Sequence, residues 1–255
     1  MNTLRQDFTE KKAANHKFAA LTAYDYPMGR LLDDMGLDLI LVGDSLGMVV
    51  LGMPDTTGVT IDHMVHHTAA VGRGVTQTLL VGDLSADAAP DPKTALTNAR
   101  RLTDAGAKAV KIEGGIEVLP IVRALLDEHI PVLGHLGMLP QRVKEEGGYR
   151  IKGKTDDQAR RLLEDAEALA LAGVFGIVLE LVTPPVAEQL SRAIPVPTIG
   201  IGSGEGCDGQ ILVTYDLLGM FPWFTPKFVK PKINVASQIQ TAVKEFIDES
   251  RKPKP

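Results

Sequence analysis

The chain has 255 residues, of which 44% are hydrophobic and 23% charged, as in an ordinary globular protein. Its formal net charge of −5 gives no electrostatic reason to expect nucleic acid or an anionic membrane as a partner. The single cysteine, Cys207, excludes an internal disulfide. The N-terminal stretch is polar and lacks the apolar core of a signal peptide, and no apolar run is long enough to span a bilayer. These features predict a soluble protein in a reducing cytoplasm.

Short apolar runs recur along the chain, and each is leucine-rich or β-branched without alternating polarity. Such runs are typical of parallel strands that are buried on both faces. The runs that fit this pattern are Phe18–Tyr24, Asp38–Gly43, Thr78–Gly82, Ala109–Ile112, Pro131–Gly134, Gly176–Leu181, Pro197–Ile201 and Gln210–Tyr215.

Longer amphipathic stretches separate these runs and predict helices. They are Asp25–Met35, Thr60–Gly72, Asp91–Ala105, Glu117–Glu128, Thr155–Ala172, Pro184–Ala193 and Val235–Glu249. Thr60 is a candidate N-cap, and Pro92 stands where the first turn of a helix accepts proline. Thr155 with Gln158 resembles a capping box.

The alternation of strands and helices over 255 residues predicts an α/β fold, namely a (β/α)8 TIM barrel. A doubly wound open sheet alternates in the same way and is the alternative. No repeat or low-complexity tract divides the chain, so we expect a single domain over residues 1–255. The polar end at about 251–255 is expected to be a disordered tail.

Ionisable side chains stand at successive ends of the predicted strands. They are Asp25 after the first strand, Asp44 beside Ser45 after the second, Asp83 after the third, Lys111 and Glu113 around the end of the fourth, His135 after the fifth and Glu180 near the end of the sixth. A single acid at such a position is usually a helix cap. For Asp25, a contact with the site and capping of the following helix are equally good explanations. The repetition indicates a site, because a (β/α)8 barrel carries its chemistry at the C-terminal ends of its strands.

The residue types at these ends indicate metal-assisted enolisation. Asp44, Asp83 and Glu113 offer oxygen ligands with no cysteine nearby, which favours Mg²⁺ over Zn²⁺. A 2-oxo acid could chelate such an ion, which would stabilise the enolate formed when the adjacent carbon loses a proton. Lys111 would place a positive charge beside the anion, and Glu180 could move the proton. These residues predict a reaction class without naming a substrate.

The chain resembles the ketopantoate hydroxymethyltransferase (3-methyl-2-oxobutanoate hydroxymethyltransferase) family from about Lys17 to Lys230. The segments that carry the resemblance are LTAYDYP (21–27), LVGDSLGMVVLG (41–52), the run that ends at His66, VKIEGG (110–115), PVLGHLGMLPQ (131–141), GGY (147–149), VLELV (178–182), IPVPTIGIGSG (194–204), CDGQILV (207–213) and PKFVK (226–230). Each segment alone is weak, but their order and spacing together are specific.

This resemblance implies a barrel of the phosphoenolpyruvate/pyruvate type that uses Mg²⁺ and 5,10-methylenetetrahydrofolate. The reaction it implies transfers a hydroxymethyl group to 3-methyl-2-oxobutanoate and gives 2-dehydropantoate, in pantothenate and hence coenzyme A biosynthesis. A large homo-oligomer, commonly a decamer, is also implied. Carried over residue by residue, the resemblance implies that the metal is held by Asp44, Asp83 and Glu113, that the 2-oxo acid is contacted by Asp44, Ser45, Asp83, Lys111 and His135, and that Glu180 is the general base.

Three departures from the family pattern stand out, namely LSADAAPDP after Asp83, Lys152 in place of glutamine and Ser203 in place of alanine. They bear on loop conformation and folate contacts.

Two alternative functions stay open. One is an Mg²⁺-dependent C–C lyase or mutase acting on another 2-oxo acid, and the other is a catalytically silent ligand-binding barrel.

Three histidines and the cysteine receive simpler interpretations. His63, His66 and His67 have helical spacing but lack carboxylates in register, so we expect no metal site there. His66 is expected to pack or hydrogen-bond within the fold, while the other two face solvent. Cys207 has no paired base, which favours a structural role.

Overall fold

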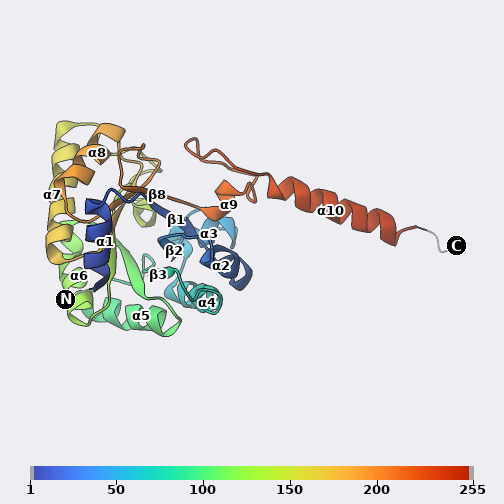
Figure 1. The fold of residues 1–255 in the computed structure, drawn as a ribbon, viewed down its shortest axis with the longest axis horizontal. Helices are drawn as coiled ribbons and strands as arrows, with labels where there is room; N and C mark the ends of the chain where they lie inside the picture. The colour runs from blue at the N-terminus through green and yellow to red at the C-terminus, as the bar shows by residue number, and fades with distance from the viewer. Residues whose placement is uncertain (1–2, 253–255) are drawn as a thin grey trace. The chain divides into compact units, whose positions relative to one another are not determined.

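The computed structural model describes residues 3–252 and divides into two compact units, Met1–Ile211 and Leu212–Pro255. Eight parallel strands close into a barrel in sequence order. Figure 1 shows strands of this barrel with helices beside them. The strands are β1 (Phe18–Thr22), β2 (Leu39–Val42), β3 (Leu79–Asp83), β4 (Ala109–Glu113), β5 (Val132–Gly137), β6 (Gly176–Glu180), β7 (Thr198–Ile201) and β8 (Gly209–Leu212). This closure confirms the predicted (β/α)8 barrel and excludes the open sheet.

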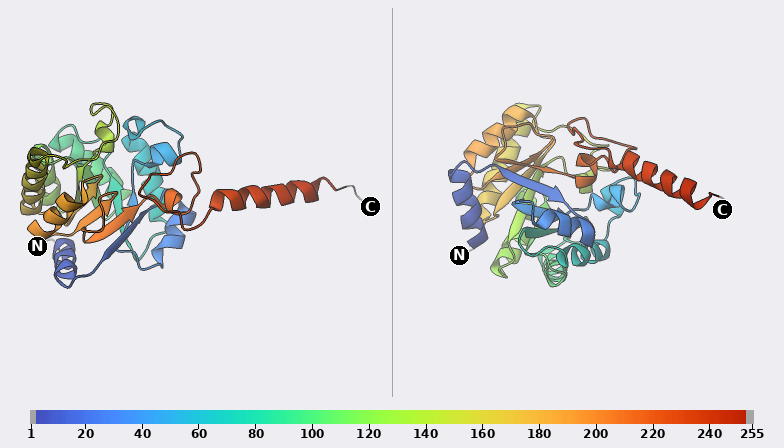
Figure 2. Two further views of the ribbon diagram at one scale, coloured as in Figure 1. Left: turned by 90° about the horizontal axis from the view of Figure 1, so that it is seen from above. Right: turned by 45° about the vertical axis from the view of Figure 1, so that its right-hand side comes forward.

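Helices surround the strands of the first unit, as the two views of Figure 2 show. They are α1 (Thr3–Ala13), α2 (Tyr26–Asp33), α3 (Leu46–Val49), α4 (Ile61–Gly72), α5 (Pro92–Asp104), α6 (Leu119–Asp127), α7 (Asp156–Ala172) and α8 (Pro184–Ala193), with short 3-10 turns η1 (Thr56–Gly58), η2 (Ile116–Val118) and η3 (Pro140–Arg142). Helices α2 and α4 to α8 match predicted stretches. Helices α1 and α3 were not predicted.

Thr60 and Thr155 cap their helices as predicted, but the full capping box lies at α4 and not at α7. The Thr60 hydroxyl accepts from the His63 N–H, and the His63 ring accepts from the Thr60 N–H, so the capping box lies at α4. Thr155 caps α7 through the Gln158 N–H. The Gln158 side chain accepts from the Lys154 N–H instead of the Thr155 N–H, so the expected box at α7 is half made.

The strand register places the candidate site residues side by side. Asp83 pairs with Lys111, and Glu113 pairs with His135. Strand β5 runs on to Gly137, so His135 lies inside the strand. The prediction that His135 follows the fifth strand was therefore wrong, because the polar histidine continues the ladder instead of ending it.

Helix α1 covers the end of the barrel where the strands begin. Phe8 is 2% exposed and stacks on Phe18, with ring centroids 5.1 Å apart. Its ring also meets the edge of Phe175 at 5.0 Å. These rings belong to one apolar cluster with the first residues of several strands, including Leu39 and Ala109. Phe8 thus closes the core at the N-terminal end of the strands.

The second unit contains α9 (Thr214–Leu217) and α10 (Val235–Ser250). Hydrogen bonds from the N–H groups of Lys232 and Val235 to the carbonyls of Leu217 and Leu218 join the two helices. None of the described residues of α10 is buried. Among the helices within residues 3–252, none combines the length and apolarity that a membrane crossing requires. The single-domain organisation and the cytoplasmic location stay predictions, and residues 253–255 of the expected tail lie outside the described residues.

Candidate active site

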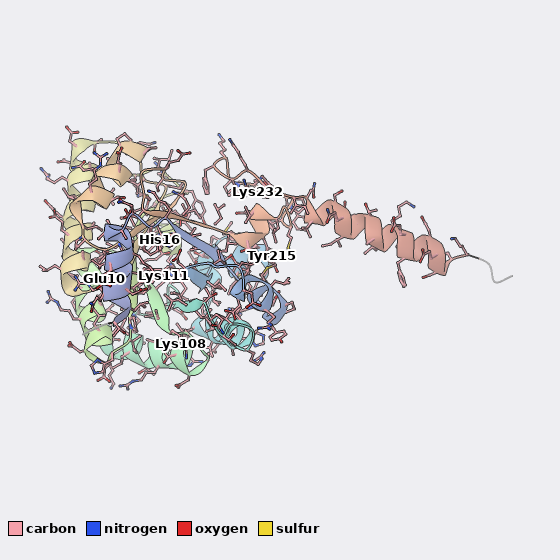
Figure 3. All side chains as sticks on the ribbon, in the orientation of Figure 1. Glu10, His16, Lys108, Lys111, Tyr215 and Lys232 are labelled. Atoms are coloured by element: carbon pink, nitrogen blue, oxygen red, sulfur yellow. The ribbon has the colours of Figure 1, made fainter. Side chains whose placement is uncertain are left out.

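The C-terminal ends of five neighbouring strands bring the predicted ionisable residues together. These residues are Asp44 just beyond β2, Asp83 at the end of β3, Lys111 and Glu113 on β4, His135 in β5 and Glu180 at the end of β6. All but Glu180 are at most 6% exposed, and the Glu180 side chain is 16% exposed. Figure 3 labels Lys111, which lies among the strands of the barrel. Charged residues that are buried this deeply need partners.

Lys111 is the centre of this cluster. Its Nζ lies 2.9 Å from Asp83 Oδ1, 3.4 Å from Glu113 Oε1 and 3.3 Å from His135 Nδ1. Burial opposes the charge on Lys111, but the carboxylates of Asp83, Glu113 and Asp44 outweigh it and raise its pKa above the ordinary value. Lys111 is therefore a fixed cation at the end of the barrel.

His135 connects Lys111 and Glu113 to Glu180. Its Nδ1 lies 3.2 Å from Glu113 Oε1, and its Nε2 lies 3.4 Å from Glu180 Oε2. Burial and Lys111 oppose protonation, but Glu113 and Glu180 outweigh both and raise the pKa of His135 to about 9. The buried Nε2 makes no hydrogen bond of good geometry. It can therefore donate to a substrate oxygen or to Glu180.

Asp44 and Asp83 form a pair of buried carboxylates, and Lys111, which pairs with Asp83, compensates their negative charge only in part. The Asp44 N–H donates to Asp83 Oδ2 at 3.2 Å, which brings the two residues into contact. Burial, with the Asp83 charge next, raises the pKa of Asp44 well above its ordinary value. Burial also raises the pKa of Asp83 despite Lys111. Asp83 Oδ1 has no hydrogen bond of good geometry.

These observations fit a cation that completes its coordination outside the protein. Within residues 3–252, no three histidine, cysteine, aspartate or glutamate side chains form a ready metal cage. A pair of carboxylates is what Mg²⁺ usually takes from a protein, with water and substrate supplying the other ligands. Asp44 and Asp83 suit that mode because Lys111 compensates only part of their negative charge. A divalent cation beside them would lower both pKa values.

Glu113 differs from these two aspartates. Its Oε1 faces Lys111 and His135, and its Oε2 accepts from the Gln141 N–H at 3.1 Å. Burial would raise the pKa of Glu113, but Lys111 and His135 outweigh it and lower that pKa. Glu113 is thus already satisfied within the protein, and its role as a metal ligand stays a prediction.

Sequence reasoning missed Gln141. Its Nε2 donates to Asp44 Oδ2 at 3.0 Å and to the Leu84 carbonyl at 2.9 Å. The side chain therefore fixes one carboxylate of the aspartate pair to the loop after β3. The only sequence signal was the position of Gln141 at the end of the PVLGHLGMLPQ segment.

Ser45 is next to Asp44, but its hydroxyl points to another partner. Its Oγ and the Tyr24 hydroxyl are 2.8 Å apart and share a hydrogen bond. Substrate contact by Ser45 stays a prediction. Asp25 caps α2 by accepting from the Met28 N–H at 2.8 Å, which is the simpler of its two interpretations.

The expectations for two histidines of α4 were reversed. His66 is exposed. His67 is half-buried and its Nδ1 donates to the Tyr24 carbonyl at 2.6 Å. The spacing of these residues could not show which one faces the barrel, because neighbouring positions on a helix differ by only about 100°.

The atypical Ser203 supports the strand that carries Glu180. Its hydroxyl donates to the Leu179 carbonyl at 2.7 Å and accepts from the Val182 N–H at 3.0 Å. It therefore braces β6 on both sides of Glu180. Atypical Lys152 pairs with Glu146 in the connection before α7. Burial raises the pKa of the Cys207 thiol, which favours a structural role for that residue.

Solved structures with similar folds have low sequence identity to this chain. A putative phosphonomutase from Burkholderia cenocepacia matches with a TM-score of 0.67 and 14% identity over 98% of this chain and 99% of its own. A 2,3-dimethylmalate lyase of the PEP mutase/isocitrate lyase superfamily matches with a TM-score of 0.64 and 15% identity, covering 100% of this chain and 91% of its own. A phosphonopyruvate hydrolase in complex with oxalate and Mg²⁺ matches with a TM-score of 0.62 and 12% identity over 98% and 99%. These similarities establish the fold alone.

Relatives found by sequence have a much higher sequence identity to this chain than these solved structures. The 3-methyl-2-oxobutanoate hydroxymethyltransferase of Acetivibrio thermocellus is 50% identical over 95% of this chain and 86% of its own length. The enzyme of the same name from Ignicoccus hospitalis is 49% identical over 96% and 94%. A sequence model of ketopantoate hydroxymethyltransferase matches residues 2–254. With this match over nearly the whole chain and the acid-lined barrel end, the chain belongs to the ketopantoate hydroxymethyltransferase family of enzymes.

Proposed function

We propose that this protein transfers a hydroxymethyl group from 5,10-methylenetetrahydrofolate to 3-methyl-2-oxobutanoate, giving 2-dehydropantoate. The observation that carries this proposal is the meeting of Asp44, Asp83, Lys111 and Glu180 at one end of the barrel. The names of relatives about 50% identical supply the substrate.

Asp44 and Asp83 would hold Mg²⁺ in this proposal, and a structural neighbour crystallised with oxalate and Mg²⁺ supports that choice of ion. When bound, Mg²⁺ supplies the positive charge that chelates a 2-oxo acid through its keto oxygen and carboxylate and that stabilises charge developing on the keto oxygen. The side-chain amide of Gln141 orients the Asp44 carboxylate for this task.

Different residues of the chain move the proton and stabilise the negative charge that forms on the substrate. Glu180 removes the proton from C3 of the keto acid, because it is the most exposed carboxylate of the cluster and lies at its edge. His135 Nε2, 3.4 Å from Glu180 Oε2, orients that carboxylate and can contact the substrate. The buried ammonium of Lys111 stabilises negative charge on the substrate. The carbanion forms a C–C bond to the methylene carbon of the folate, both C–N bonds of that carbon break, and water supplies the hydroxyl group of the product. The proton taken from C3 and the remaining proton of the water go to the two folate nitrogens, which releases tetrahydrofolate.

An assay of product formation with defined components tests this proposal against its rivals. With Mg²⁺, 3-methyl-2-oxobutanoate and 5,10-methylenetetrahydrofolate, we expect NMR to show 2-dehydropantoate and tetrahydrofolate in equal amounts. Cleavage or rearrangement of a 2-oxo acid without folate would favour the lyase or mutase alternative. Binding of keto acid without any reaction would favour the silent barrel.

We also propose that the protein is a homo-oligomer. Helix α10 carries exposed apolar side chains at Ile239, Val243 and Phe246, which are 51%, 50% and 68% exposed. Their spacing places them on one stripe of the helix, and apolar stripes of this kind mark association surfaces. Light scattering should give a mass that is a multiple of 27.4 kDa, and a monomer at all concentrations would contradict this.

A further inference from the structure

The connection between η3 and α7, residues 143–155, crosses the C-terminal end of the barrel. On one side the Tyr149 hydroxyl donates to Met48 Sδ of α3 at 3.6 Å. On the other side Lys152 forms a bridge with Val182, and its N–H donates to the Leu181 carbonyl at 2.7 Å. The connection therefore runs from the residues that follow Asp44 to the residues that follow Glu180.

A pocket of about 640 Å³ lies along this connection. Its lining residues are Gly147, Tyr149, Arg150, Ile151, Lys154 and Gln158, and we call it the Tyr149 pocket. Tyr149 and Ile151 are 45% and 48% exposed, so the pocket offers an aromatic and an aliphatic surface to a ligand. Gly147 has a φ of 65°, which turns the chain sharply before Tyr149.

The positive charges of the connection are distributed unevenly. Lys144 pairs with Asp55 at 3.6 Å, and Lys152 pairs with Glu146. Arg150 and Lys154 have no carboxylate partner among residues 3–252, and both line the Tyr149 pocket. The Arg150 guanidinium makes a single contact, at 3.5 Å, with the Gly147 carbonyl. The two unpaired cations of the connection therefore lie where the pocket is.

Tyr149 also lies within electrostatic range of the catalytic acids. Burial, followed by the negative charges of Glu180 and Asp44, raises the pKa of its hydroxyl. Tyr149 thus lines the pocket that bears its name, and its hydroxyl is near enough to Glu180 and Asp44 to be affected by their charges. A ligand in this pocket would be able to extend into the end of the barrel.

We propose that the Tyr149 pocket binds the aminobenzoyl-glutamate part of the reduced folate. The benzoyl ring would pack on Tyr149 and Ile151, and the glutamate carboxylates would bind Arg150 and Lys154. The one-carbon unit of this folate is attached next to the aminobenzoyl group, so a unit delivered to the substrate requires the tail to leave the barrel nearby. An extended ligand with an aromatic ring and two carboxylates matches the surface and the charges of the pocket. This assignment rests on the proposed function.

Replacement of both cations, Arg150→Gln with Lys154→Gln, tests the assignment. We expect the KM for 5,10-methylenetetrahydrofolate to rise about 10-fold, because two charge-assisted hydrogen bonds are lost. The KM for 3-methyl-2-oxobutanoate and the exchange of its C3 proton in D₂O should not change, which also shows that the variant is folded. Lys144→Gln is the matched control, since Lys144 belongs to the same connection but pairs with Asp55, and it should leave the folate KM unchanged.

A folate analogue without the tail separates charge recognition from a general disturbance. For 5,10-methylenetetrahydropteroate, which lacks the glutamate, the wild type should already show the higher KM and the double variant should add nothing. An equal rise for both folates, or no rise for either, would overturn the assignment while wild-type activity upholds the proposed function. A wild type without folate-dependent product formation would overturn both.

Discussion

At the C-terminal end of the barrel, a carboxylate whose charge is compensated lies close to two carboxylates whose charge is compensated only in part. Lys111 pairs with both Asp83 and Glu113, and the carboxylate of Glu113 is satisfied within the protein. The same lysine compensates only part of the negative charge of Asp44 and Asp83, and a cation beside these two aspartates would compensate the rest. This division explains why a metal would select the two aspartates, and it makes Gln141, which holds one of them, important for metal affinity.

Replacement of Gln141 by alanine should weaken metal binding. We expect the Kd for Mg²⁺ to rise about 10- to 100-fold, the usual effect of losing a group that orients a metal ligand. Calorimetric titration with Mg²⁺ measures this directly. Gln189→Ala removes an exposed glutamine from α8 and serves as the control. An unchanged Kd in Gln141→Ala would show that the Asp44 carboxylate needs no such support.

Replacement of Glu180 by glutamine should separate proton transfer from metal binding. We expect exchange of the C3 proton of 3-methyl-2-oxobutanoate to slow at least about 100-fold, because a glutamine side chain cannot accept this proton. The Kd for Mg²⁺ should change little, since Asp44 and Asp83 remain. Glu188→Gln alters an exposed acid of α8 and controls for the loss of one charge. Exchange at the parent rate would remove Glu180 from the role of base.

Outside the candidate active site, the buried Asp33 connects two secondary-structure elements, helix α2 and strand β3. Asp33, the last residue of α2, is 3% exposed and accepts from the N–H groups of Thr76, Gln77 and Thr78 just before β3. Burial opposes its charge, but the hydrogen bonds from Thr78, Thr76 and Gln77 outweigh it and lower the pKa of Asp33 well below its ordinary value. Asp33 thus anchors α2 to the start of a barrel strand.

Asp33→Asn should therefore destabilise the protein in a pH-dependent way. We expect a loss of about 2 kcal/mol near pH 7, because several hydrogen bonds to a charged acceptor weaken. The unfolded chain takes up a proton at Asp33 as the pH falls below its ordinary pKa of 3.8, whereas the folded chain does not. The difference between wild type and variant should shrink below about pH 4 as a result. Urea denaturation at several pH values measures it, and a difference independent of pH would contradict this role.

At the scale of the whole barrel, the residues proposed for the reaction and the residues that stabilise the core lie at opposite ends of the strands. The cluster of buried ionisable residues lies where the strands end, and the aromatic cluster around Phe8 lies where they begin. This arrangement is general for (β/α)8 barrels, in which one end carries the reaction and the other end contributes stability. It allows the two properties to be changed independently.

Phe8→Ala should lower stability without affecting the reaction. We expect a loss of about 3 kcal/mol or more, because a fully buried aromatic side chain leaves a cavity. The rate of C3 proton exchange at 25 °C should stay at the parent value in the folded protein. Leu171→Ala, at a position that is 86% exposed, should change neither property. A large loss of exchange activity in folded Phe8→Ala would show that the two ends are coupled.

The sequence predicted the strands and the meeting of their terminal residues because both depend on local patterns. Apolar runs mark strands that are buried on both faces, and barrel closure then fixes which ends meet. Six residues, Asp44, Asp83, Lys111, Glu113, His135 and Glu180, were predicted in this way, and the strand ends bring them together. The same logic placed the end of β5 too early, because glycines and a histidine interrupt the apolar run although the ladder continues to Gly137.

Other features depend on contacts that no local pattern reveals. Helix α1 has a polar sequence and buries only Phe8, so its helical structure is visible only with the barrel present. The contact between Gln141 and Asp44 joins residues 97 positions apart. The choice between His66 and His67 depends on how α4 is rotated against the Tyr24 carbonyl. The pairing of Lys152 with Glu146, which leaves Arg150 and Lys154 without a carboxylate partner among the described residues, likewise needs the folded connection.

The measurement that tests the central claim most directly is exchange of the C3 proton of 3-methyl-2-oxobutanoate in D₂O, followed by NMR. We predict that the wild-type protein catalyses this exchange with Mg²⁺ and without folate, and that a chelator abolishes it. That result would establish that the acid-lined end of the barrel enolises the keto acid. Absence of exchange by the folded protein with Mg²⁺, even when tetrahydrofolate is added, would contradict the account.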